Sequence, residues 1–114
     1  MPEPRLATHM LVSSLIRRAS AQGDIATVIR KGDPTAGALL LITRIRGNIL
    51  SLYEQFPTLD GARIWQSIRL QAVESQEKLD QYLEQRGHRD PDLWVLELDV
   101  AFDERLAPYL ASGA

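Results

Sequence analysis

The stretch ALLLITRIRGNILSLYEQ, residues 38–55, decides the fold. Its first part, residues 38–46, is rich in residues that favour β-strands, and so is its last part, residues 49–55. Between them stands Gly47-Asn48, a two-residue turn of the kind whose backbone twist matches that of paired strands. We therefore predict a β-hairpin here.

The neighbouring segments extend this hairpin into a sheet. Residues 25–31 have the composition of a strand, and the loop 32–37, with its glycines, proline and aspartate, is expected to join it to the hairpin as a turn. After a further turn at residues 57–61, apolar and polar residues alternate from 62 to 71, as in a half-buried strand. The first four strands are thus expected to form an antiparallel meander.

Helices and one more strand flank this meander. Apolar residues recur every three or four positions in residues 8–21 and, as a narrower stripe, in residues 75–86, which predicts two helices, the second ending at Gly87. Residues 93–100 begin apolar on both faces, which indicates an interior strand. The prediction is one α+β domain, residues 1–114, with a mainly antiparallel sheet of about five strands (the four-strand meander plus one strand after a helix) and two helices.

Both faces of the predicted sheet are apolar. One face is expected to carry Ile25, Ile29, Leu40, Ile42, Ile49 and Tyr53, and the other Val28, Leu39, Leu41, Ile45, Leu50 and Leu52. Each face needs a cover, because exposed apolar patches of this size mark interaction sites. Either one helix packs on each face, or both helices cover one face and the other meets a second subunit in a homodimer.

Composition and charge exclude several classes of protein. With 45% hydrophobic and 25% charged residues the chain is typical of a globular domain, and without cysteine it has neither disulfides nor thiolate sites. No apolar run reaches the length of a membrane span and the start shows no leader pattern, so we expect a cytoplasmic protein without membrane contact. The net charge of −2 argues against a nucleic-acid partner.

The charges are unevenly distributed along the chain. Residues 1–69 hold nine basic and five acidic residues, whereas residues 70–114 hold four basic and ten acidic ones. Such polarity is found on partner surfaces, but it also arises when two parts of one fold complement each other. We favour the second interpretation.

Familiar catalytic and metal-binding motifs are not found. His9 and His88 lie far apart in the sequence and have no ligand spacing, so we predict neither a metal nor a cofactor. Ser13 and Ser14 lack a nucleophile-elbow pattern. The loop 32–37 is followed by a strand and has no glycine-lysine-hydroxyl ending, so a plain connecting loop is favoured over a phosphate site.

One constellation of side chains suggests binding. A positive patch is expected if the end of the first helix approaches the hairpin; its members are Arg17, Arg18, Arg44 and Arg46. Trp65 and Trp94 are candidate aromatic contacts for a ligand, although core packing is the commoner role of tryptophan. Glu97 and Asp99 point to the same side of their strand.

Four segments together resemble a known family. They are LVSSLIRRA at residues 11–19, RKGDPTAGALLL at 30–41, DGARIW at 60–65 and DPDLWVLEL at 90–98. They are similar to an uncharacterised alphaproteobacterial family, domain of unknown function 1491, over residues 5–100. The resemblance implies a compact α+β domain in the cytoplasm, supplies no catalytic residue, and does not extend to residues 102–114.

The leading functional hypothesis is a non-enzymatic domain that binds another protein or a small ligand. An alternative is a small enzyme that uses the carboxylates of Glu97 and Asp99 with Arg44 and Arg46, if these four residues meet in a pocket. A third alternative is weak nucleic-acid binding through the arginines and tryptophans, which predicts a steep dependence of affinity on salt.

Overall fold

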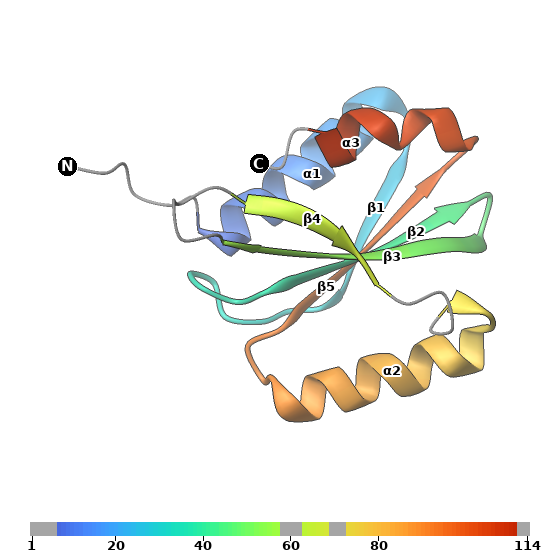
Figure 1. Cartoon of the computed structure of the whole chain (residues 1–114). Coiled ribbons are helices and arrows are strands. Elements are labelled where there is room, and N and C mark those ends of the chain that lie inside the picture. Colours follow the sequence, from blue (N-terminus) through green and yellow to red (C-terminus); the bar gives the residue numbers. More distant parts are fainter. Residues whose placement is uncertain (1–6, 58–62, 69–72, 112–114) are drawn as a thin grey trace.

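The computed structural model describes residues 7–57, 63–68 and 73–111. Figure 1 shows their arrangement, a sheet between helices. The elements are α1 (Thr8–Gln22), β1 (Ile25–Arg30), β2 (Leu39–Ile45), β3 (Asn48–Pro57), β4 (Arg63–Ser67), α2 (Gln76–Arg89), β5 (Trp94–Val100), a 3₁₀ turn (Asp103–Arg105) and α3 (Ala107–Ala111). The α+β prediction is confirmed, with three α-helices in the described residues in place of two.

The five described strands form one mixed sheet in the order β1-β5-β2-β3-β4. β5 lies between β1 and β2, antiparallel to the first and parallel to the second. The predicted four-strand meander is therefore wrong: only β2, β3 and β4 form one, and the loop 32–37 does not close a hairpin. The interior position predicted for residues 93–100 is right, because a strand that is apolar on both faces is best buried between two others.

The β2–β3 hairpin is confirmed, with its turn one residue earlier than expected. Ile45 pairs with Asn48, so the two turn residues are Arg46 and Gly47, with φ angles of 50° and 85°. Both are left-handed, as this tight hairpin turn requires; glycine adopts the conformation without strain, whereas arginine seldom does.

A bulge in β3 reverses the expected facing of the following residues. Thr43 pairs with Ser51 and Arg44 with Ile49, which leaves Leu50 as the extra residue. As a result Leu52 packs with Leu40 and Ile42, not with Leu39 and Leu41 as expected, and Tyr53 points to the opposite face.

Helices cover both faces of the sheet. Figure 1 shows α1 and α3 on one side and α2 on the other. The first core contains Leu41, Leu96 and Leu98 against α1 and α3, and the second contains Leu40 and Val95 against α2. Of the two arrangements considered, the structure has helices on each face, so an entirely uncovered sheet face is not the basis for a dimer.

The C-terminal segment is fastened beside α1 by a buried carboxylate. Asp24 accepts hydrogen bonds from the Tyr109 hydroxyl at 2.6 Å and from Arg105 Nε at 2.9 Å. Burial alone would raise the pKa of Asp24, but these two hydrogen bonds outweigh it and hold the pKa below its ordinary value. Burial and the bond to Asp24 raise the pKa of Tyr109 to about 12. Residues beyond 100, which had no expected role, thus help to close this side of the sheet.

Candidate functional site

The four arginines expected to form one positive patch lie on different sides of the sheet. They are Arg17, Arg18, Arg44 and Arg46. Arg44 meets Glu97 on the side of α2, whereas Arg18 lies on the opposite side, over the ring of Tyr109. The other two are exposed. The structure therefore does not bring these side chains together into one surface.

Arg44 is held by a network at the tip of the hairpin. Its Nε lies 3.1 Å from Glu97, its Nη1 donates to the carbonyl of Gly47 at 3.1 Å, and its Nη2 donates to Gln76 at 2.7 Å. Asp99 accepts the backbone N–H of Gly47 at 3.2 Å. Glu97, Asp99 and Arg44 of the carboxylate–arginine alternative thus bind one another or the turn, whereas Arg46 is an exposed residue of that turn. This network connects the hairpin to β5 and α2.

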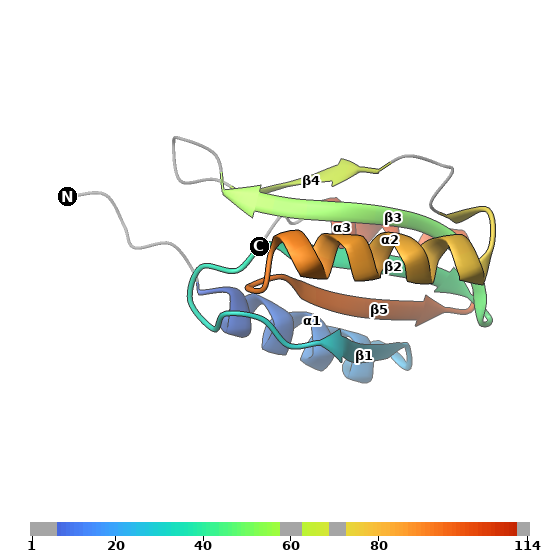
Figure 2. The same cartoon turned by 90° about the horizontal axis from the view of Figure 1, so that it is seen from below.

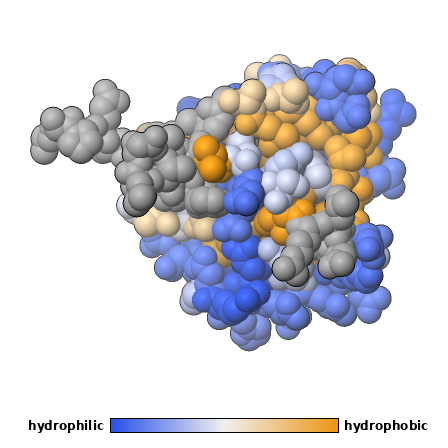
Figure 3. Space-filling view, viewed as in Figure 1, coloured by the Kyte–Doolittle hydropathy of each residue, from blue (hydrophilic) through white to orange (hydrophobic). Residues whose placement is uncertain are grey.

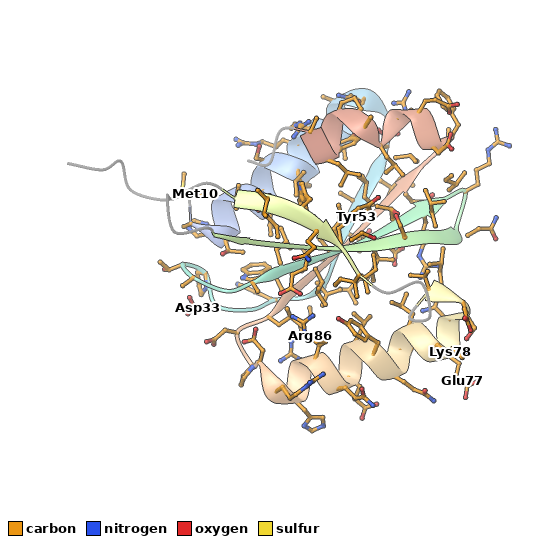
Figure 4. All side chains as sticks on the ribbon, in the orientation of Figure 1. Met10, Asp33, Tyr53, Glu77, Lys78 and Arg86 are labelled. Carbon is orange, nitrogen blue, oxygen red and sulfur yellow. The ribbon has the colours of Figure 1, made fainter. Side chains whose placement is uncertain are left out.

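The two tryptophans have different surroundings. Trp94 is 4% exposed and donates its indole N–H to the carbonyl of Asp33 at 2.6 Å, so it packs in the core and fixes the loop 32–37. Trp65 is half-buried at the margin of the core under α1 and α3, near Tyr53, which Figure 4 shows on that side of the sheet. Figure 3 shows apolar residues gathered over α3 and the adjoining strand ends. Of the two rings, only Trp65 has a surface that a ligand can reach.

A second ion pair, between α2 and β3, was not foreseen from the sequence. Arg86 donates to both carboxylate oxygens of Glu54, at 2.9 and 3.0 Å, and to the hydroxyl of Tyr82 at 2.8 Å. The bonds to Glu54 raise the pKa of Arg86 further above its ordinary value. Figure 4 shows Arg86 between helix and sheet, where it attaches α2 to the sheet. Its spacing of 32 residues from Glu54 leaves no local signal in the sequence.

The part of the chain that the structure describes contains neither a metal-binding cluster nor a membrane-spanning helix. No group of three or more histidine, aspartate or glutamate side chains there is arranged to hold a metal ion. None of the helices there has both the length and the apolar composition that crossing a bilayer requires.

A bulge in β1 turns Arg30 toward α2. Val28 pairs with Leu96 but Arg30 with Val95, so Ile29 is an extra residue. Without it Arg30 would share the face of Val28, since side chains alternate along a strand. Bulges often redirect a side chain beside a functional site.

The guanidinium of Arg30 packs closely against α2 at Gly87. A Cβ atom built on Gly87 would stand 3.0 Å from Nη1 and 3.2 Å from Cζ of Arg30. The Nε of Arg30 donates to the carbonyl of Leu93 at 3.2 Å, and its Nη2 donates to that of Pro91 at 3.4 Å. Helix α2 was expected to stop at Gly87, but it continues to Arg89 and so presents a bare glycine to Arg30.

An open cleft of about 320 Å³ lies at this contact. It is lined by Arg30 at the end of β1 and by Glu84, Gly87 and His88 from α2. The last three are spaced so that they share one side of the helix. Sequence reasoning missed this site because it treated the residues separately and because the bulge that positions Arg30 was not foreseen.

Beside the cleft, strand β1 forms an open edge of the sheet. In Figure 2, viewed from the side of α2, the helix lies over the middle strands and leaves β1 and β5 in view. The exposed fractions of Ile25, Val28 and Ile29 are 65%, 40% and 50%. These are large values for isoleucine and valine in a strand. Among the described strands, β1 therefore has one backbone edge without a partner and carries exposed apolar side chains beside it.

Comparisons with known proteins find a single family. The model of the family "Protein of unknown function (DUF1491)" matches residues 6–108. A crystal structure of a DUF1491 family protein from Caulobacter crescentus CB15 is 38% identical, with a TM-score of 0.70, over 84% of this chain and 89% of that one. An NMR structure of a DUF1491 family protein from the same organism is 37% identical, with a TM-score of 0.69, over 86% and 88%.

A more distant relative has the same fold. The solution structure of protein Atu0922 from A. tumefaciens is 29% identical, with a TM-score of 0.69, over 90% of this chain and 92% of that one. The curated proteins include no match. The family resemblance noted in the sequence is thereby confirmed, and the match extends beyond the expected limit at residue 100, to residue 108.

Proposed function

Because the chain belongs to the DUF1491 family of proteins of unknown function, we propose its function from its own surface: a non-enzymatic interaction domain that forms a homodimer by pairing β1 with β1 of a second copy. The observation that carries the proposal is the open edge of β1 with its exposed isoleucines. This moves the expected dimer contact from a sheet face to a sheet edge.

The composition of β1 supports strand pairing. Proteins usually protect an edge strand with lysine, proline or an inward-pointing charge, because an unprotected edge accepts another strand. Residues 25–29 read Ile-Ala-Thr-Val-Ile and contain none of these; the bulge at Ile29 and the inward-pointing Arg30 stand only at the end of the strand. β4, the opposite edge among the described strands, has five residues, whereas β1 has six. Of the two edges, β1 is therefore the better template for an added strand.

The sequence of β1 also suits pairing with itself. Ile25 and Ile29 are each two residues from Thr27. In an antiparallel pair centred on Thr27, Ile25 of one copy lies opposite Ile29 of the other, so both apolar side chains find a partner. A contact of this kind closes with twofold symmetry and leaves no further edge of the same type.

The size of this contact sets the expected affinity. Stable interfaces bury roughly 1,200–2,000 Å², and a pair of six-residue strands needs help from neighbouring exposed residues to reach that range. Figure 2 shows α1 alongside β1, where its exposed side chains can contribute. We therefore expect a reversible dimer with a dissociation constant in the micromolar range.

Sedimentation velocity from low micromolar to submillimolar protein tests the proposal. We expect the wild-type mass to rise from monomer to dimer, and Thr27→Lys to keep the chain monomeric, because two lysines would face each other at the centre of the strand pair. The matched control is Gln66→Lys on β4, which should dimerise like the wild type. A monomeric wild type throughout, or equal loss of dimer in both variants, would contradict the proposal.

The cytoplasmic location remains part of this proposal and is supported by the absence of cysteine. The enzyme and nucleic-acid alternatives have less support. The carboxylates and arginines that they need bind one another or lie on different sides of the sheet.

A further inference from the structure

The end of β1 holds an arginine whose charge is not balanced by the fold. Five arginines in the described residues are half-buried: Arg18, Arg30, Arg44, Arg86 and Arg105. Three of them have a carboxylate partner within 4.0 Å, and Arg18 lies over an aromatic ring. Arg30 has only the two main-chain carbonyls named above, within the part of the chain that the structure describes.

Neutral acceptors fix the position of the Arg30 guanidinium without cancelling its charge. Nε and Nη2 donate to these carbonyls, but Nη1 donates no hydrogen bond to any described residue. Nη1 lies next to Gly87. A half-buried guanidinium held in this way is already oriented for an oxyanion, and bonds between two charged groups are about twice as strong as neutral ones.

The glycine against which Arg30 lies is costly for the helix. Glycine inside a helix lowers stability by roughly 1 kcal/mol relative to alanine. The close approach of Arg30 gives this glycine a role, because a Cβ atom at position 87 would force the guanidinium to shift by a few tenths of an ångström.

The other side chains of the cleft narrow the choice of ligand. Glu84 opposes a multiply charged anion but favours a positive or hydrogen-donating group, and His88 offers a ring N–H or an acceptor. Glu84 and Arg30 are not within ion-pair distance of each other, although both line the cleft. Each therefore has its charge available for a bound molecule.

We propose that this cleft binds a small zwitterionic ligand of the amino-acid type, with its carboxylate on Arg30 and its ammonium group toward Glu84. The cleft volume of about 320 Å³ is at the lower end of ligand-binding pockets, which suits a small molecule. This binding goes beyond the pairing of β1, since the cleft faces α2 and is complete within one copy of the chain.

NMR titrations with three probes at constant ionic strength test this site: glycine, acetate and methylammonium. We expect saturable shifts of the Gly87 and His88 amide signals, with glycine binding more tightly than acetate and methylammonium most weakly. Arg30→Gln should weaken glycine binding about tenfold or more. The matched control is Arg89→Gln, because Arg89 is an exposed arginine of α2 that does not line the cleft.

Glu84→Gln distinguishes a site for zwitterions from a general anion site. Glu84 is exposed, so this variant should fold normally even if Arg30→Gln does not. We expect it to bind acetate more tightly than the wild type does and to lose the preference for glycine over acetate. Absence of saturable shifts with all three probes, or unchanged preference in Glu84→Gln, would overturn the proposal.

Discussion

Asp24, immediately before β1, and Arg30, at its end, are charged residues at opposite ends of one strand, and their surroundings differ. The side chain of Asp24 is 2% exposed and is bonded to Arg105 and Tyr109. Arg30 is half-buried, without a carboxylate partner in the described residues, beside an open cleft. A buried charge that is fully paired holds the fold together, whereas a fixed but unpaired charge is available to a ligand.

Removing each of these two charges in turn should give the largest difference in the free energy of unfolding. Asp24→Ala leaves the Tyr109 hydroxyl buried without its acceptor and the C-terminal segment without its anchor, so we expect a loss of about 3 kcal/mol in the free energy of unfolding. Arg30→Gln loses two long bonds to neutral carbonyls, and we expect about 1 kcal/mol or less. Urea unfolding of both variants measures this. Equal losses would remove the distinction between the two ends.

The pH dependence of stability should reflect the shifted pKa values of Asp24 and Tyr109. The pKa of Asp24 is lowered in the folded state, so its contribution is present above the unfolded value of about 3.9 and is lost as the pH falls through the folded-state pKa. The pKa of Tyr109 is raised to about 12, so its contribution is present below about pH 10 and is lost as the pH rises toward 12.

Comparison with Tyr109→Phe isolates the alkaline part of this dependence. Between pH 10 and 12 we expect the wild type to lose on the order of 2 kcal/mol more than the variant, because the Tyr109 phenol ionises there in the unfolded state but stays largely protonated in the folded state. Thermal unfolding across this pH range gives the answer. Parallel curves for the two proteins would show that Tyr109 is not held by Asp24.

A double-mutant cycle at Arg30 and Gly87 should show a smaller effect, and here the substitution should increase stability. Gly87→Ala should stabilise the helix by roughly 1 kcal/mol in the Arg30→Gln background, where no guanidinium lies against position 87. In the wild-type background the new methyl group meets Nη1 at 3.0 Å, so we expect little or no gain. Chemical denaturation measures all four proteins, and an equal gain in both backgrounds would contradict the close contact of Arg30 with Gly87.

The smallest expected effect concerns Arg46, a charged residue that belongs to neither end. Its φ of 50° is unfavourable for arginine, so Arg46→Gly should stabilise the protein by about 0.5–1 kcal/mol and leave glycine binding in the cleft unchanged. Thermal unfolding and one NMR titration check this. Destabilisation would mean that the arginine side chain contributes more than its backbone costs.

The elements themselves follow largely from local patterns in the sequence. The hairpin over residues 38–55 and the interior strand over 93–100 come from alternation and turn chemistry that act between neighbours. The glycine that ends α1, Gly23, adopts φ 80°, the conformation typical of such a stop. The family resemblance agreed with the α+β class already predicted from these patterns and supplied no site.

What the sequence did not predict depends on distant pairs and on single extra residues. The insertion of β5 between β1 and β2 joins strands far apart in the chain, and the Asp24–Tyr109 bond spans 85 residues. The bulges at Ile29 and Leu50 each reverse a facing that strict alternation would give. The first of these bulges positions Arg30, so the cleft could not be predicted from the sequence pattern.

Amide hydrogen exchange at low and high protein concentration tests the central claim, that β1 is the surface through which this chain meets another, most directly. We predict that residues 25–29 gain protection as concentration rises and that β4 does not, since only the free edge of β1 becomes hydrogen-bonded in the dimer. Protection of β1 that stays the same at every concentration, or a gain confined to other strands, would contradict the account.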